Sequence, residues 1–237
     1  MGWLRAARRP CAQGGFKIIL DCLASHSRPG AARSRTGNVL TGGCLATKQH
    51  TLAVLAASGR QVGDQAIAHT VTVYDPLEVF GEGGALADSG AEVKKPTFFY
   101  GKEPALPAGA AQMRDTIKDA DCLLVVTPEY NHAAPPALLG MLDNFGGSNF
   151  GYKPLGIVTY SAGPWGGMRA AMALRPIIAE LGAMSASRIA GFPNAGEMFH
   201  EDGTPKDPEH RMLKQVRLPC LQLTAGLTCR QATLSPR

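Results

Sequence analysis

Residues 123–132 read LLVVTPEYNH, an apolar run followed by a polar loop that contains a proline. The run predicts a buried strand, and Pro128 is expected to end its sheet ladder because proline has no N–H donor. Residues 135–143 then predict a helix with prolines in its first turn. In open parallel sheets, ligands lie outside the carboxyl ends of the strands. The loop at 127–132 is therefore the first candidate for a binding site.

This loop has two interpretations. Its residues Glu129, Tyr130 and Asn131 can offer backbone N–H groups, an aromatic face and an amide to a flat ligand. An ordinary turn between a strand and a helix, with Asn131 as the helix N-cap, explains the same residues. In either case we expect Glu129 to present its backbone rather than its carboxylate. We expect His132 to start the helix or to contact another subunit rather than to act as a base.

Strand-like and helical segments alternate along the chain, which is typical of βαβ units and a mainly parallel sheet. Gly182 is expected to end one helix as a C-cap, and Pro176 to kink that helix or to mark a restart. Residues 25–38 and 80–109 are predicted as loops. The predicted strands are residues 16–23, 70–74, 122–126, 155–160 and 185–189, and the predicted helices are residues 110–120, 135–143, 168–181 and 208–216.

Size and composition indicate one globular domain. The chain has 237 residues, of which 45% are hydrophobic, and no apolar run approaches the ~20 residues that a membrane span needs. The six cysteines show neither a C-x-x-C pair nor the spacing of metal ligands, so we predict a reducing compartment and no metal site. Residues 1–15 are predicted as a disordered extension, residues 16–216 as the domain with an atypical stretch at 39–68, and residues 217–237 as an atypical tail.

Positive charge is concentrated at the amino end. The net charge is +5, and residues 1–63 contain nine Lys and Arg residues against one acid. Such a segment can meet phosphate, nucleic acid or a targeting receptor. We do not expect nucleic-acid or membrane binding. Residues 1–15 lack the apolar stretch of a secretory signal. We therefore predict a cytoplasmic protein, with a mitochondrial transit peptide as the alternative.

Three loops are expected on one edge of a doubly wound sheet, after the first, third and fourth strands. The loop at 25–35 carries hydroxyl and guanidinium groups, which suit a phosphate, although a basic surface loop is the alternative. The loop at 161–167 is rich in glycine, which lets the backbone approach a ring edge closely. Its Trp165 is either a lid or a subunit contact. A phosphate site and a flat-ring site on one edge suit a mononucleotide with a tricyclic base.

Four motifs in chain order make a resemblance specific. They are TPEYNH at 127–132, LDN at 142–144, SAGPWGGMRA at 161–170 and ELGA at 180–183. The set resembles the flavodoxin-like family of NAD(P)H-dependent FMN reductases and quinone reductases. Residues 27–30 and 74–78 extend the likeness more weakly. The resemblance implies a five-stranded doubly wound parallel sheet in the order 2-1-3-4-5, within three α/β/α layers.

The resemblance also implies chemistry. FMN is expected to bind without a covalent link, NADPH or NADH to supply hydride, and a quinone, flavin or similar small molecule to accept it. The flavin carries the reaction, so no catalytic side chain is expected, and the protein is expected as a homodimer or homotetramer with Trp165 and residues 145–152 at the interface. The implied FMN contacts are Ser27, Arg28 and Arg35 at the phosphate, Pro128, Glu129, Tyr130, Asn131 and His132 around the ring, and Ser161, Gly163 and Gly166 at the far ring edge.

Two departures from the family keep a second hypothesis open. The family's G-S-x-R loop reads Ser25-His26-Ser27-Arg28 in this chain, and the stretch between Arg35 and Thr70 is longer than the family's first helix needs. A non-catalytic or degenerate flavodoxin-like module that acts through protein contacts is therefore the alternative. A one-electron carrier is less favoured, because such carriers are usually acidic and this chain is basic.

Overall fold

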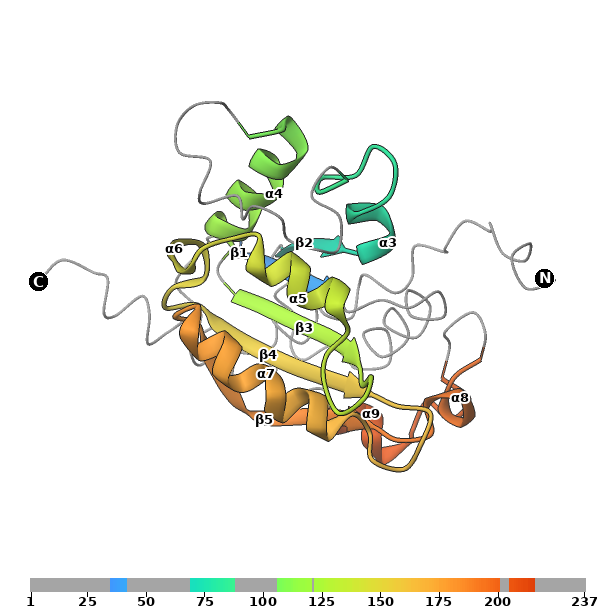
Figure 1. Cartoon of the computed structure of the whole chain (residues 1–237). Helices are drawn as coiled ribbons and strands as arrows, with labels where there is room; N and C mark the ends of the chain where they lie inside the picture. The colour runs from blue at the N-terminus through green and yellow to red at the C-terminus, as the bar shows by residue number, and fades with distance from the viewer. Residues whose placement is uncertain (1–34, 42–68, 88–105, 121, 201–204, 216–237) are drawn as a thin grey trace, which may run out of the picture.

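The computed structural model describes residues 35–41, 69–87, 106–120, 122–200 and 205–215. Five parallel strands form one sheet in the order β2-β1-β3-β4-β5 (Figure 1). The predicted α/β class with a parallel sheet is confirmed. The strands are β1 (Arg35–Thr41), β2 (His69–Tyr74), β3 (Cys122–Pro128), β4 (Pro154–Tyr160) and β5 (Met184–Phe192).

The first described strand is not the one that the sequence predicted. β1 begins at Arg35, inside the stretch predicted as a loop, and lies between β2 and β3. Its Gly37 and Asn38 are residue types that are depleted in strands, and they conceal the pattern of Thr, Val and Leu around them. The predicted strand at 16–23 lies outside the described residues. The strand order implied by the resemblance counted that segment, and not β1, as the first strand.

β3 is the central strand and β4 lies beside it, and all residues of both strands are buried. Helices that cover both faces of a parallel sheet explain such continuous burial. β3 extends past the predicted end at Val126, and its last residue, Pro128, lies opposite Tyr160 of β4. A proline is tolerated there because the end of the strand needs no further ladder bond from its nitrogen.

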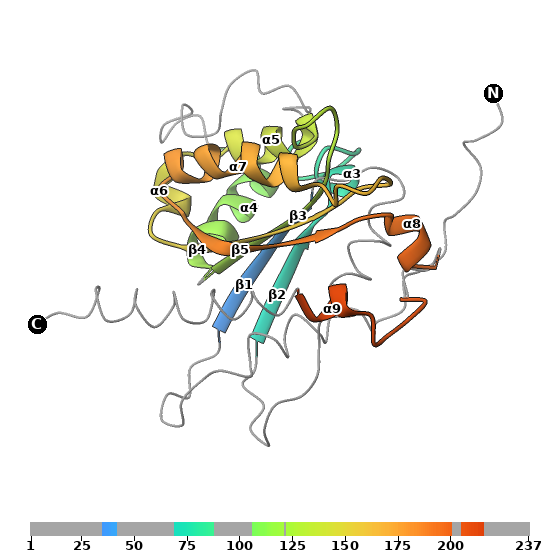
Figure 2. The same cartoon turned by 90° about the horizontal axis from the view of Figure 1, so that it is seen from below.

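The helices at 108–119, 136–143 and 168–180 cover one face of this sheet, and the short helix at 211–215 lies against the other face (Figure 2). The helices predicted at 110–120, 135–143 and 168–181 are confirmed, and the helix predicted at 208–216 is shorter than predicted. None of the described helices is long and apolar enough to cross a membrane. The C-cap of the helix at 168–180 is Leu181, and Gly182, predicted as the C-cap, follows it with φ +77°. The helices are α3 (Pro76–Val79), α4 (Ala108–Asp119), α5 (Pro136–Asp143), α6 (Gly147–Phe150), α7 (Met168–Glu180), α8 (Ala195–Met198) and α9 (Arg211–Gln215).

The alternating side chains of β3 build two cores. Leu123 and Val125 pack in the larger cluster with residues of α4, α5 and α7. Leu124 and Val126 face the other cluster, which contains Leu213 of α9. This two-sided packing fixes where β3 and β4 end, and so it fixes the positions of the loops that follow them.

Candidate functional site

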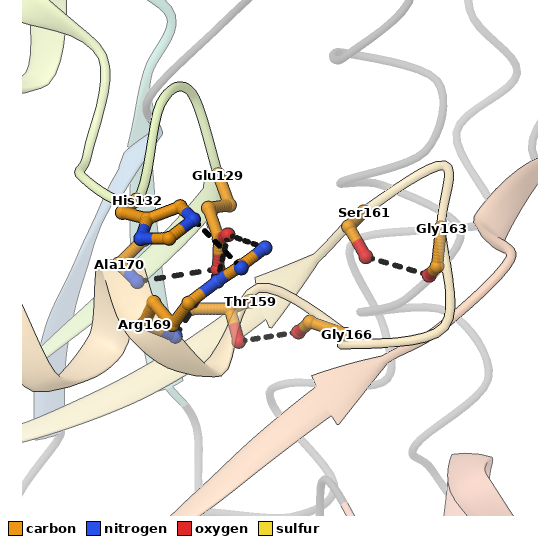
Figure 3. Close-up of polar contacts among 8 residues, drawn as sticks. All are labelled: Glu129, His132, Thr159, Ser161, Gly163, Gly166, Arg169 and Ala170. Atoms are coloured by element: carbon orange, nitrogen blue, oxygen red, sulfur yellow. Dashed lines mark hydrogen bonds and ion pairs between the residues drawn. The ribbon is translucent and has the colours of Figure 1, made fainter.

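The loops after β3 and β4 lie beside each other at the carboxyl edge of the sheet (Figure 3). The last residues of the two strands pair directly, and the N–H of Glu129 then donates to the carbonyl of Tyr160 at 3.2 Å. The two loops are therefore neighbours in the structure, as predicted. The loop that follows β1 begins at residue 42, outside the described residues.

The loop after β3 forms a tight turn from Tyr130 to Ala133. These two residues exchange backbone hydrogen bonds of 2.9 and 3.0 Å. The two central residues, Asn131 and His132, have φ of 50° and 67°, the positive values that a type I′ turn requires. Asn131 is not the N-cap of the following helix, because Pro135 holds that position, so the N-cap interpretation is wrong. His132 does not start the helix either.

This geometry changes what the turn can offer to a ligand. The N–H groups of Glu129 and Tyr130 both donate to carbonyls of the protein, so the expected backbone contacts of these two residues with a flat ligand are corrected. The side chain of Tyr130 remains accessible, since 41% of the residue is exposed. An aromatic face on the edge of the sheet is thus the main feature that the turn presents.

The carboxylate of Glu129, rather than its backbone, makes the long-range contacts. Its side chain is 4% exposed and forms an ion pair with Arg169 at the start of α7. It also accepts hydrogen bonds from the backbone N–H groups of Arg169 and Ala170, at 3.1 and 3.4 Å (Figure 3). The prediction that Glu129 would present its backbone is wrong, because a buried carboxylate must find donors and α7 supplies them.

These contacts also set the charge of Glu129. Burial by itself would raise the pKa of this carboxyl group. The hydrogen bonds from the Arg169 side chain and the Ala170 N–H, together with the positive charge of Arg169, outweigh burial and lower the pKa of Glu129 below its ordinary 4.5. Glu129 is therefore a carboxylate at neutral pH.

Arg169 connects the same turn at a second point. Its Nη1 lies 2.7 Å from Nε2 of His132, and its guanidinium lies over the ring of Trp165, 5.7 Å from the ring centroid. Trp165 itself is 65% exposed. Sequence reasoning missed Arg169, although it stands in the SAGPWGGMRA motif directly after the glycine pair.

The loop after β4 is fixed to the carboxyl end of β5. The N–H of Ser161 donates to Phe192, and the N–H groups of Asn194 and Ala195 donate back to Gly163 and Ser161, all at 3.0 Å. The Ser161 hydroxyl donates to the carbonyl of Gly163 at 2.8 Å (Figure 3). The Ser161 hydroxyl therefore bonds within its own loop and helps to shape it.

The glycines of this loop have two different roles. Gly167, with φ +75°, packs against β4, whereas a Cβ on Gly163 would meet nothing within 4 Å. Gly166, with φ +62°, is held by the hydroxyl of Thr159, which donates to its carbonyl at 2.8 Å. Among the described residues, no acceptor is bonded to the N–H groups of Gly163 and Gly166. The loop thus combines a rigid backbone, open space and two donors.

The predicted contacts divide into three groups. Those from 128–132 and 161–166 share one edge of the sheet, as predicted. Ser27 and Arg28 lie outside the described residues. Arg35 is corrected: it begins β1, and the end of this seven-residue strand lies about 20 Å further along. Since all strands are parallel, Arg35 lies at the amino edge of the sheet and is removed from the phosphate set.

Residues 85–197 match the family model described as NADPH-dependent FMN reductase. The matched part is 113 of the 237 residues, and this part of the chain is similar to that family. The match includes both loops of the site, with the TPEYNH and SAGPWGGMRA motifs. The resemblance predicted from those motifs is confirmed.

Individual relatives match a shorter part of the chain. This chain is 33% identical over 85 residues to the NADH:(hydroxy)cinnamate reductase subunit CrdA of Vibrio ruber, and the match covers 35% of this chain and 42% of that protein. This chain is also 35% identical over 86 residues to a quinone reductase of Escherichia coli strain K12, and the match covers 35% of this chain and 46% of that protein. The chain thus spans less than half the length of either relative in these matches.

A solved structure supports the fold over a longer range. An oxidoreductase from Corynebacterium diphtheriae superposes with a TM-score of 0.57 at 15% identity, over 82% of this chain and 97% of that one. At this level of identity the similarity concerns the architecture alone. It agrees with the parallel α/β sheet described above.

Proposed function

We propose that the protein is an NAD(P)H-dependent flavoprotein reductase that uses bound FMN to pass hydride from NADPH or NADH to a small acceptor such as a quinone or a flavin. One observation carries this proposal. The loop at 161–167 is fixed by its own hydrogen bonds, yet the N–H groups of Gly163 and Gly166 have no acceptor among the described residues. They lie on the edge of the sheet that also presents the ring of Tyr130.

The residues at this edge fit the ring of FMN. The isoalloxazine ring has flat faces and a rim of carbonyl oxygens and ring nitrogens, so it needs an aromatic or apolar contact and N–H donors. Tyr130 offers the first, and the backbone of Gly163 and Gly166 offers the second, with open space in front of Gly163. When bound, FMN would supply the hydride-transfer chemistry. The loop donors would stabilise negative charge on the reduced ring without any movement of the backbone.

The proposed contacts with the FMN phosphate are supported by the sequence alone. Ser27 and Arg28 are retained as proposed phosphate contacts, since hydroxyl and guanidinium groups are the usual partners of a phosphate. Arg35 is not retained, because its place at the amino edge separates it from the ring loops. The degenerate-module hypothesis is less favoured, since the residues at the ring end keep an arrangement that fits the cofactor.

The proposal includes an oligomer. Trp165 and Tyr152, which belong to the two segments expected at a subunit interface, are 65% and 74% exposed in the single chain. Exposed aromatic residues of this size are enriched where proteins associate. A homodimer or homotetramer in the cytoplasm remains our proposal, and light scattering of the purified protein measures the subunit number.

Absorbance of the purified protein tests the function directly. A reductase would show the two visible bands of bound flavin, lose them when NADPH or NADH is added, and regain them when a quinone is supplied. A colourless protein that takes up no added FMN would instead support the module that acts through protein contacts. The same assay with NADPH and NADH in parallel identifies the preferred donor.

Tyr130→Ala is predicted to weaken FMN binding about tenfold, because stacking on one aromatic side chain contributes about 1–3 kcal/mol per base and about 1.4 kcal/mol corresponds to a factor of ten. A titration that follows flavin fluorescence measures the dissociation constant. Met184→Ala is the control, since Met184 is an exposed apolar side chain at the start of β5, at the amino edge of the sheet. Equal affinities for Tyr130→Ala and wild type would remove Tyr130 from the ring site.

A further inference from the structure

One side chain connects the two loops of the proposed ring site. Glu129 precedes the Tyr130 turn, and its carboxylate contacts the start of α7, which directly follows the glycine loop. These positions are 40 residues apart in the chain. The carboxylate of Glu129 therefore connects the loop after β3 with the loop after β4.

Helix α7 depends on this contact because it lacks a cap of its own. Its N-cap residue is Gly167, and no side chain of the cap position accepts a hydrogen bond from the helix. The first N–H groups of any helix have no partner within the helix. Glu129 accepts from two of them, those of Arg169 and Ala170. A negative charge is favourable at that end of the helix dipole.

The Arg169 side chain adds a second connection to the same turn. It pairs with Glu129 just before the turn, and its Nη1 contacts Nε2 of His132 inside the turn at 2.7 Å. Since an arginine only donates, the ring nitrogen of His132 is the acceptor in this contact. The turn is thus held from both of its sides by α7.

We infer that Glu129 is a positioning residue, whose carboxylate holds the Tyr130 turn in register with the glycine loop through the N-terminus of α7 and Arg169. The connection between the loops is a property of the protein without ligand. Its effect on flavin rests on the proposed function, so the two are measured separately.

Glu129→Gln tests this inference with little change of shape. Glutamine keeps one oxygen acceptor but loses the negative charge that pairs with Arg169. In the protein without FMN, hydrogen exchange of the Arg169 and Ala170 amides is expected to accelerate about tenfold, since charge-assisted hydrogen bonds are roughly twice as strong as neutral ones. The dissociation constants for FMN and for riboflavin are expected to rise by a similar factor, because the contact at issue is with the ring.

The control is a carboxylate that is paired with arginine away from the site. Asp115 of α4 lies 2.8 Å from Arg114, and both side chains are exposed. Asp115→Asn removes an equal charge and is expected to leave amide protection in α7 and flavin affinity unchanged. A loss in this variant equal to that in Glu129→Gln would show a general charge effect and overturn the inference.

A pH profile distinguishes a carboxylate that bonds to α7 through its charge from a side chain that is only packed against α7. Since contacts with α7 depress the pKa of Glu129, protection of the Arg169 and Ala170 amides should be complete above pH 4.5 and be lost as pH falls through the lower folded value. Among the described contacts, the charged or titratable partners of Glu129 and Arg169 are each other and His132. The measurement is repeated in His132→Asn, which replaces this third partner by a side chain without charge. Glu129→Gln in that background should show no transition.

The outcomes distinguish this inference from the proposed function. A wild-type protein that binds no FMN would contradict the reductase, while amide exchange would still decide whether Glu129 holds α7 to the turn. Unchanged exchange in Glu129→Gln would overturn the inference even in an active reductase. Faster exchange with unchanged flavin affinity in a flavin-binding wild type would also overturn it, because Glu129 would then stabilise α7 without positioning the ring loops.

Discussion

Gly167→Ala is expected to lower the free energy of unfolding by about 3 kcal/mol, which corresponds to a fall in Tm of roughly 6–12 °C for a domain of this size. Two costs add. Gly167 has φ +75°, and the left-handed region costs a residue with a Cβ about 1–2 kcal/mol. The new Cβ would also lie 2.7 Å from Cβ of Thr159 and 2.9 Å from the carbonyl of Tyr160, which forces β4 to shift. Such overpacking costs about 1–3 kcal/mol. Urea denaturation measures the loss.

Gly163→Ala is the matched control in the same loop. Its Cβ would meet nothing within 4 Å and Gly163 has no positive φ, so stability should stay within about 0.5 kcal/mol of wild type. The added methyl group would instead occupy the space that we assign to the flavin, so this variant should fold normally and bind FMN more weakly. If Gly163→Ala lost as much stability as Gly167→Ala, the roles of the two glycines would be wrong.

The contrast between these glycines shows what the sequence could predict. The apolar runs at 122–126 and 155–160 and the glycine-rich stretch after the second run predicted two buried strands and a loop that approaches a ligand, and both strands are present. Local patterns are sufficient for such elements, because burial on both faces demands continuous apolar residues. Which glycine contacts β4 and which faces open space depends on contacts with another strand, and spacing alone does not contain that information.

Long-range polar contacts were the main source of error. The expectation that Glu129 would use its backbone considered only its own loop, in which a proline and a turn dominate the pattern. Its actual partner, Arg169, lies 40 residues away and is brought near by the pairing of β3 with β4. The role assigned to Arg35 failed for a related reason. The sequence placed Arg35 in a loop after a strand at 16–23, which lies outside the described residues, whereas the structure shows Arg35 as the first residue of β1.

Lys153 is a further residue whose role only the structure reveals. It stands directly before β4, and 2% of the residue is exposed. Its ammonium donates to the carbonyls of Ile117 and Lys118, which lie in the last turn of α4. Carbonyls at the end of a helix have no partner within the helix, and a positive charge is favourable at that end of the dipole. Lys153 therefore fastens α4 to the start of β4.

Lys153→Ala is predicted to lower the free energy of unfolding by about 3–5 kcal/mol, because removal of one partner leaves buried groups uncompensated and opens a cavity. Lys153→Met should recover part of this loss, since methionine refills the volume of the stem but donates no hydrogen bond to the two carbonyls. Lys118→Ala is the control, because it removes an exposed side chain and keeps the backbone carbonyl that Lys153 contacts. Urea denaturation compares the three variants. Equal stability of Lys153→Met and wild type would mean that the stem stabilises this junction and that the charge of Lys153 does not.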